Sequence, residues 1–390
     1  MTTMKEAVKK NTMLIALAVV MVLFQILIGL AGKGSLFAPS NISNLINQNA
    51  YVVILATGML LCILTGGNID LSVGSIVAMI GALAGTLIVN MKLNIYLSIV
   101  LCLITGILIG MWQGFWIAYV RIPAFIVTLA GMLLWRGVAL LILNGLTISP
   151  FPENYLVYFT SFLPGSGSPV FVATATMLTA VVVCAIFVST QILERGKKRR
   201  KNYEIEAGGM FLARLVLICA VVLASAYLLG QHKGIPVVLI LLAVIVIAYG
   251  YFTSRTVPGR HFYAMGGNEK AAKLSGIDTN RVLFLAYTNM AFLSAVAALT
   301  CVARFNSAAP TAGTNYEMDA IGSCFIGGAS AYGGTGTVSG AVIGAIFMGV
   351  LNNGMSILGI DANWQKAVKG LVLLAAVIFD VVSKKRSRAS

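Results

Sequence analysis

Charged and reactive side chains are scarce in this 390-residue sequence. Only 10% of the residues are charged, 12 are acidic, and the two histidines, His232 and His261, lie far apart. The sequence has no G-x-x-x-x-G-K-[ST] phosphate-binding loop, no HExxH or GxSxG motif and no pair of carboxylates at a recognisable site. Binding of ATP through such a loop is therefore excluded, and we expect neither catalysis nor a metal or cofactor in this chain.

Carboxylates are also nearly missing from the long apolar runs. A secondary carrier that couples solute movement to protons or sodium usually places several carboxylates or histidines inside the membrane. Here Asp70 and Asp380 come closest to such a position. Ion coupling is disfavoured for this reason, although a stand-alone secondary sugar carrier stays open as an alternative.

Hydrophobic residues make up 59% of the sequence. Apolar runs of roughly 18 to 25 residues recur, each long enough to cross a hydrocarbon core ~30 Å thick. They predict an all-α, polytopic transmembrane helical bundle that forms a single domain over residues 1–390. We expect about twelve spans, one of them short, glycine-rich and broken; they cover 13–30, 46–65, 73–90, 95–119, 124–143, 170–190, 208–229, 235–253, 282–303, 319–333, 338–357 and 365–383.

The net charge of +15 comes from residues at the ends of these runs. Lysines and arginines gather before residue 13, in the loops 195–201 and 255–281, and in the tail after residue 383, whereas 144–169 has none. The positive-inside rule therefore predicts cytoplasmic termini and basic loops, with 144–169 on the other side. Membrane lipid head groups are the expected counter-charges. No basic face is interleaved with aromatic residues, so nucleic acid is not an expected partner.

The order of the spans predicts two related halves. If 170–229 is an added helical hairpin with a basic cytoplasmic loop, a first half (13–143) and a second half (235–383) of five spans each remain. An odd number of spans makes such halves inverted relative to each other, as in many transporters. Asp70-Leu-Ser-Val-Gly-Ser and Asp319-Ala-Ile-Gly-Ser are a short match between the halves, although a match of this length also arises by chance.

Polar residues inside or beside the spans are candidates for a translocation path. Gly66–Ser75 carries a carboxylate and small polar groups between two apolar runs, where bilayer depth makes them costly. The alternative is an ordinary polar turn at the cytoplasmic surface, with Asp70 capping the next helix. Aromatic rings beside amides would suit a neutral hydroxylated solute, but belt tryptophans and interhelical hydrogen bonds explain the same residues. The candidate path residues are Asn68, Asp70, Ser72, Trp112, Gln113, Trp116, Asn289, Asp319, Asn352 and Asn353.

The loop 255–281 contains a second candidate site. Asn268 is a good N-cap, Glu269 suits a first turn, Lys273 suits a last turn and Gly276 suits the stop. The resulting two-turn helix is too short to be stable alone and needs a partner surface; the alternative is a helix lying flat on the lipid interface. The candidate contact residues are Gly267, Asn268, Glu269, Lys270, Ala271, Ala272, Lys273, Leu274, Ser275 and Gly276.

Several motifs in order resemble one known family. They are Gly66–Ser75, the stretch Arg121-Ile-Pro-Ala-Phe-Ile-Val-Thr-Leu-Ala-Gly131, the loop from Gly259 to Gly276, and the run from Asp319 to Gly336. Together they resemble the permease subunit of monosaccharide ABC importers, the family of the ribose, galactose and xylose permeases. The hairpin 170–229 and the ending Asn352-Asn353-Gly-Met-Ser look most similar to the xylose and multiple-monosaccharide members.

This resemblance implies a set of partners. A permease of this kind works in the bacterial inner membrane as a pair of copies, with a cytoplasmic ATPase subunit that binds ATP and Mg and an extracytoplasmic sugar-binding protein. The segment 267–276 matches the part that docks the ATPase. Branched-chain amino-acid and nucleoside ABC permeases are similar in outline, and they stay open as alternatives for the solute.

Overall fold

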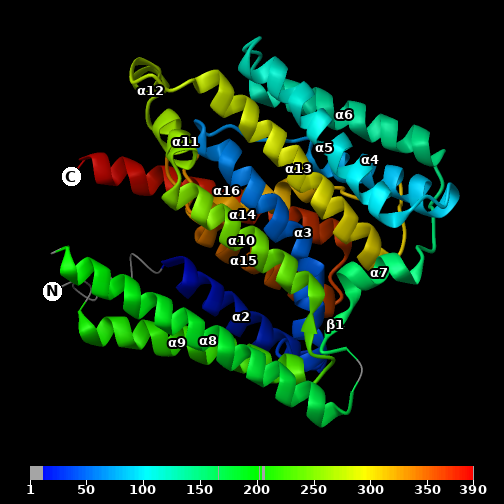
Figure 1. Ribbon diagram of the computed structural model, residues 1–390, viewed down its shortest axis with the longest axis vertical. Coiled ribbons are helices and arrows are strands. Elements are labelled where there is room, and N and C mark those ends of the chain that lie inside the picture. Colours follow the sequence, from blue (N-terminus) through cyan, green and yellow to red (C-terminus); the bar gives the residue numbers. More distant parts are fainter. Residues whose placement is uncertain (1–11, 166, 202, 204–206, 390) are drawn as a thin grey trace.

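The computed structural model describes residues 12–165, 167–201, 203 and 207–389, and it is a helical bundle (Figure 1). Among these residues, ten helices are long and apolar enough to cross a membrane. The predicted fold class is therefore confirmed. The ten are α2 (Thr12–Leu30), α3 (Pro39–Leu64), α4 (Val73–Gly85) with its π-helical continuation η1 (Thr86–Asn90), α5 (Ile95–Ala118), α6 (Ala124–Leu143), α8 (Pro169–Arg200), α9 (Gly208–Gly230), α10 (Val237–Arg255), α13 (Thr279–Phe305) and α15 (Val338–Ile357).

Two of the twelve predicted spans are not among these ten. The segment 319–333 contains α14 (Tyr316–Ile326), whose 11 residues are about 16 Å long and cover roughly half of a hydrocarbon core. A glycine-rich coil follows it, as the prediction of a broken helix requires. The segment 365–383 lies in α16 (Ala362–Ala389), where Lys366, Lys369 and Asp380 interrupt the apolar sequence.

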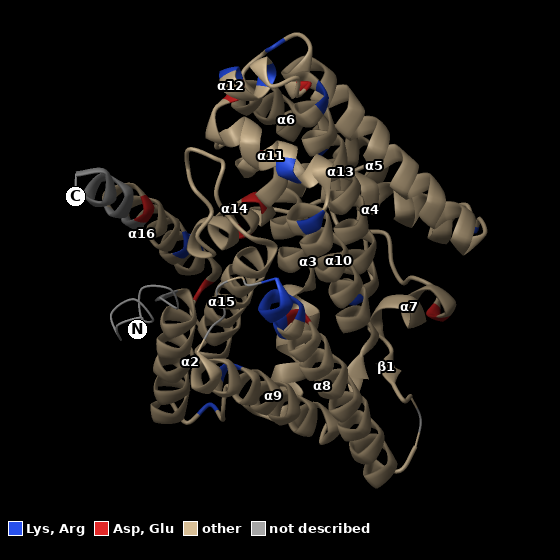
Figure 2. Ribbon diagram, turned by 60° about the vertical axis from the view of Figure 1, so that its left-hand side comes forward, with Lys and Arg blue, Asp and Glu red and all other residues tan. Residues whose placement is uncertain are grey.

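Short elements mark the two ends of the bundle. Helices α11 (Val257–Gly267) and α12 (Glu269–Leu274) lie at the end that we call the basic end, and Figure 2 shows lysines and arginines there. Helix α7 (Glu153–Thr160) lies at the opposite end, which we call the α7 end (Figure 1). There β1 (Phe162–Leu163) pairs antiparallel with β2 (Ile235–Pro236).

The buried core surrounds α3 and α13, the two central helices of the bundle. In α3, 78% of the apolar window is buried, whereas in α9 the fraction is 17%. Helix α13 packs against α5 and α4, and α3 packs in the same way against α15 and α14. Helix α4 also packs on α6, as α14 does on α16. Each of the two central helices thus packs against one long helix (α5 or α15) and against one shorter helix that follows a break in the chain (α4 or α14).

Helices α8 and α9 form a hairpin at the edge of the bundle. They pack mainly on each other, and α9 also contacts α3 and β2. Helix α8 continues to Arg200, ten residues beyond the predicted end at residue 190, and it passes through Gly196 without a break. An ion pair between Arg255 Nη2 and Glu194 Oε1 (2.6 Å) joins this extension to the end of α10.

Candidate translocation path and coupling surface

The chain folds back into the bundle between α3 and α4. The backbone N of Asp70 lies 3.5 Å from Met59 Sδ, one to two turns before the end of α3. The hydroxyl of Tyr287, from α13, donates to the carbonyl of Ile69 (3.4 Å). Asp70 is fully buried, so the alternative of a turn at the surface is wrong for this residue.

Three predicted path residues form one hydrogen-bonded chain. Asp70 Oδ1 accepts from the backbone N (2.8 Å) and the hydroxyl (2.6 Å) of Ser72. Gln113 Nε2, from α5, donates to Ser72 Oγ (2.8 Å). All three side chains are buried without exposure. Asp70 therefore anchors a buried polar chain that links the α3–α4 segment to α5, and it does not occupy the N-cap position of α4, which is Ser72.

A second segment, 306–315, enters the bundle from the α7 end between α13 and α14. Arg136, from α6, donates through Nη1 to the carbonyls of Pro310 (3.2 Å) and Ala312 (2.5 Å). A Cβ added to Gly74 would lie 2.1 Å from Gly313 O, and one added to Gly313 would lie 2.0 Å from Gly74 O. The start of α4 and the segment before α14 therefore cross with their backbones in contact.

Asp319 lies in a separate polar group at the start of α14. Its carboxylate forms an ion pair with Lys369 Nζ of α16 (2.9 Å) and accepts from Tyr51 Oη of α3 (2.6 Å). The Tyr51 ring stacks on the Tyr316 ring with 3.8 Å between centroids. We did not predict Tyr51 and Lys369 from the sequence, because 268 and 50 residues separate them from Asp319 and neither belongs to a recognisable motif.

A cavity of about 320 Å³ opens between the helices at the α7 end. Its walls come from α3, α7, α13, the start of α10, and the segments around β1 and β2, and they combine amide, basic and aromatic side chains. Tyr51 is one of the lining residues. The cavity therefore borders the Tyr51–Asp319–Lys369 group.

The other predicted path residues are dispersed. Trp112 is 40% exposed on the outer face of α5 and packs edge-on against Trp116. Asn289 accepts from Tyr249, and Asn353 Nδ2 donates to Asn41 Oδ1 (3.1 Å) near the start of α3. Asn352 Oδ1 is buried and unpartnered among the described residues. The structure thus unites Asp70, Ser72 and Gln113, and leaves the remaining candidates apart from them.

The predicted short helix is present at the basic end as α12. Asn268 Oδ1 accepts from the backbone N of Ala271 (3.0 Å), which makes Asn268 its N-cap. Ala272 is buried against the bundle, Leu274 is 90% exposed, and Gly276 has a φ of +84°. Helix α12 thus presents one apolar side chain, Leu274, at the surface of the basic end.

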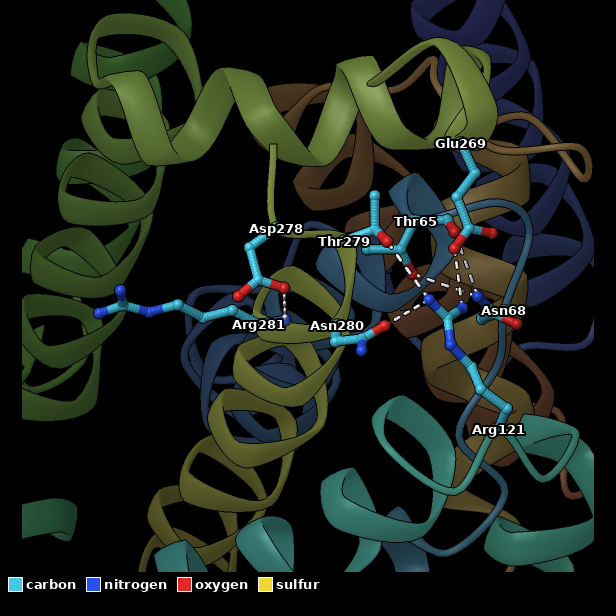
Figure 3. A network of polar contacts seen from close by, with 8 residues as sticks. All are labelled: Thr65, Asn68, Arg121, Glu269, Asp278, Thr279, Asn280 and Arg281. Atoms are coloured by element: carbon cyan, nitrogen blue, oxygen red, sulfur yellow. Dashed lines mark hydrogen bonds and ion pairs between the residues drawn. The ribbon is translucent and has the colours of Figure 1, made fainter. Parts of the chain in front are cut away.

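Arg121 connects α12 to the bundle (Figure 3). Its Nη1 contacts Glu269 Oε1 at 2.7 Å, and its Nη2 donates to Thr279 Oγ1 (3.3 Å) and to Asn280 Oδ1. Asn68 lies beside this group and donates to the carbonyl of Thr65 (3.2 Å). The loop between α5 and α6 is therefore bonded to α12 and to the start of α13, close to the end of α3.

The glycine-rich coil after α14 is bonded to two helices at the basic end. Tyr263 Oη of α11 donates to the carbonyl of Gly336 (3.0 Å), and Gly334 N donates to the carbonyl of Leu64 at the end of α3 (3.1 Å). Burial raises the pKa of the Tyr263 phenol, while a side-chain hydrogen bond with Thr253 opposes this effect. The phenol stays protonated at neutral pH and can keep donating.

Comparison with known proteins places the chain in a family. One family, described as "Branched-chain amino acid transport system / permease component", matches residues 41–377. The chain belongs to this permease family. No solved structure gives a significant match.

The sequences of known xylose and ribose permeases match nearly the whole length of this chain. The chain is 37% identical to the xylose transport system permease protein of Haemophilus influenzae over 374 residues, 96% of both chains. It is also 37% identical to the Escherichia coli protein of that name, over 91% of this chain and 88% of the relative. The ribose import permease protein of Escherichia coli is 33% identical over 88% of this chain and 86% of the relative. The resemblance to the ribose and xylose permeases is confirmed, and these relatives are named as permeases.

Proposed function

We propose that this chain is the transmembrane permease subunit of an ATP-driven importer and forms the path for a monosaccharide. The observation that carries the proposal is the pair of interrupted segments that cross at Gly74 and Gly313 inside a bundle of long apolar helices. Discontinuous helices that meet at membrane depth are typical of transport proteins. The relatives named for xylose and ribose transport support a monosaccharide as the solute.

The basic end is proposed to face the cytoplasm. Arg195 and the stretch 197–201, together with Arg255 and Arg260, lie at or near helix ends on this side, which agrees with the positive-inside rule. In this orientation the bacterial inner membrane holds the bundle with both termini in the cytoplasm. The 144–169 loop and α7 then face the extracytoplasmic side, where a sugar-binding protein would deliver its ligand.

Helix α12 is the proposed docking site of a separate ATPase subunit, which would carry ATP and Mg. Leu274 offers an apolar contact, while the burial of Ala272 fixes the helix to the bundle. The Arg121 contacts to Glu269, Thr279 and Asn280 give movement of α12 a direct route to α13 and to the α5–α6 loop. Because such bundles switch by rigid-body movement of packed helices, this route would couple ATP hydrolysis to the path. A second permease copy completes the proposed assembly.

Co-expression with a candidate ATPase tests the proposal. The assembly is purified, reconstituted in proteoliposomes and mixed with a sugar-loaded binding protein, and both ATP hydrolysis and sugar uptake are measured. D-xylose, D-ribose, L-leucine and a nucleoside are compared as solutes. Uptake of a monosaccharide that depends on ATP and on the binding protein supports the proposal. Uptake of L-leucine or the nucleoside alone supports the corresponding ABC permease, and sugar uptake without an ATPase supports a secondary carrier.

A further inference from the structure

The cavity at the α7 end lies within a single copy of the chain. Its volume of about 320 Å³ is at the lower end of the range of small-molecule sites, about 300 to 1,000 Å³. Asn47 and Tyr51 of α3 face it from one side, and Thr300 and Arg304 of α13 from the other. Phe159 of α7 also lines it. The walls belong to both of the central helices.

The polar groups of the wall include both donors and acceptors. Arg304 can donate from its guanidinium, which lies 4.7 Å from the centroid of the neighbouring Phe305 ring, and among the described residues it forms no ion pair. Asn47 Nδ2 is already bonded to the carbonyl of Ser43 (3.0 Å), which leaves its Oδ1 as an acceptor. None of the described carboxylates lines the cavity. An acceptor in the wall is unfavourable for an anion, whereas it suits a hydroxyl group that must donate.

The wall of the cavity also contains aromatic rings. Phe159 and Phe162 line the cavity together with Tyr51, and apolar ring faces suit the C–H face of a small ring-shaped solute while the polar groups bind its edge. Lys233 and His232 also line the cavity and are exposed. The Lys233 charge is therefore solvated, and the half-buried part of the wall is formed by amide, guanidinium, hydroxyl and aromatic groups.

Tyr51 is the point at which this cavity meets the buried ion pair. Its ring stacks on Tyr316, and its hydroxyl donates to Asp319, which is paired with Lys369. These contacts hold the Tyr51 side chain in the wall between the cavity and the buried ion pair.

We propose that this cavity is a low-affinity site in which one copy of the permease receives a neutral, polyhydroxylated solute, with Tyr51 as its closed floor. The inference rests on the proposed function and deepens it, because it assigns the monosaccharide to a site made by α3, α7 and α13. It needs no residue from a second copy. Asn47 and Arg304 are assigned to bind hydroxyl groups of the solute. Tyr51 is assigned to block its movement from the cavity toward the basic end.

Protection of an introduced cysteine tests the site without any ATPase. Asn44 lines the cavity and is exposed, while Asn154 is exposed on α7 and does not line it. Asn44→Cys and the control Asn154→Cys are each reconstituted in lipid nanodiscs, where both ends are accessible, and reacted with a neutral maleimide. Labelling of the unmodified chain is subtracted. D-xylose, D-ribose, L-leucine and inorganic phosphate are added in separate titrations.

We expect a pentose to slow labelling of Asn44→Cys about tenfold when its concentration is ten times the dissociation constant, and to leave Asn154→Cys unchanged. Adding Asn47→Ala to Asn44→Cys should raise the half-protecting sugar concentration about threefold to tenfold, as expected for one lost hydrogen bond. Protection by phosphate but not by sugar would overturn the inference in favour of an anion site. Equal protection by L-leucine, or no protection by either pentose up to about 100 mM, weaker than a millimolar site, would also overturn it.

These outcomes are independent of the test of the proposed function. Sugar uptake by the complete assembly together with unprotected Asn44→Cys would leave the importer in place and remove this cavity from its path. Protection of Asn44→Cys together with absent ATP-driven uptake would keep the sugar site and overturn the importer.

Discussion

Gly74 and Gly313 touch backbone to backbone, where the start of α4 crosses the segment that leads into α14. A Cβ on either residue would lie about as close to the carbonyl oxygen of the other, at 2.1 and 2.0 Å. Gly313 also has a φ of +70°, which side chains with a Cβ rarely adopt. Each half of the chain thus supplies one glycine to a single contact deep in the bundle.

Gly74→Ala should destabilise the bundle and reduce transport, because the new methyl group meets Gly313 O and Glu317 Oε2, at 2.1 and 2.6 Å. Overpacking of this kind costs about 1–3 kcal/mol. Gly137→Ala in α6 is the matched control, since a Cβ there has no atom within 4 Å. Thermal unfolding in detergent measures both, and equal midpoints for the two variants would contradict the crossing.

Ser72→Ala should destabilise the protein by about 1–3 kcal/mol, because it leaves Gln113 Nε2 without its buried partner and removes one of the two hydrogen bonds to Asp70 Oδ1. Ser294→Ala is the control: that hydroxyl is equally buried, but it bonds only to the carbonyl of Met290 in its own helix. We expect Ser294→Ala to be nearly neutral in the same unfolding assay. A similar loss for both would mean that the chain from Asp70 to Gln113 adds no stability.

Lys369→Met should destabilise the bundle by about 3–5 kcal/mol, because it leaves the buried Asp319 carboxylate without its cation. The double variant Asp319→Leu with Lys369→Met removes both charges, so its loss should be smaller than that of the single variant. Unfolding midpoints of the three proteins form the comparison. A double variant that is less stable than Lys369→Met would show that the pair is not the source of the effect.

Leu274→Ser should weaken binding of the ATPase subunit without unfolding the permease, because the side chain is 90% exposed. Removing an anchor in an interface typically costs about 2 kcal/mol or more, or roughly thirtyfold in affinity. Leu146→Ser, which alters a 68% exposed leucine at the α7 end, serves as control. The affinity of the ATPase for each variant is measured by co-purification and by titration. Unchanged binding by Leu274→Ser would exclude α12 as an apolar docking site.

Glu269→Arg should uncouple ATP hydrolysis from uptake, because it replaces the ion pair with Arg121 by repulsion. Adding Arg121→Glu reverses both charges and should restore part of the coupling. The pair is 42% and 45% exposed, so stability should change by less than about 1 kcal/mol. Lys270→Gln alters a neighbouring exposed charge as control, and the ratio of sugar taken up to ATP hydrolysed is the readout. No recovery in the double variant would contradict a role of this contact in coupling.

Local sequence signals predicted most helix limits. The starts at Val73 and Ala124 follow polar or proline residues that end the preceding turn, and α15 follows a run of glycines and a threonine cap. The extension of α8 to Arg200 could not be predicted from apolar length, because basic residues continue a helix in water as well as they end a membrane span.

The candidate sites were predicted unevenly for a physical reason. The cap by Asn268 and the bond between Asp70 and Ser72 lie within three residues, so local chemistry specifies them. The contacts of Tyr51 with Asp319 and of Arg121 with Glu269 join residues 268 and 148 positions apart, and they exist only after the helices pack. The cavity at the α7 end is likewise a product of packing.

With 32 residues, α8 is longer than a membrane crossing requires. At 1.5 Å per residue the helix measures about 48 Å, which exceeds a ~30 Å hydrocarbon core by about 18 Å, or three turns. Because Glu194 is paired with Arg255, these extra turns stand beside the end of α10. These turns end in Lys197, Lys198, Arg199 and Arg200. A protein that approaches the basic end near α10 therefore meets a positively charged helix end that extends beyond the hydrocarbon core, and an acidic surface at that place would complement it.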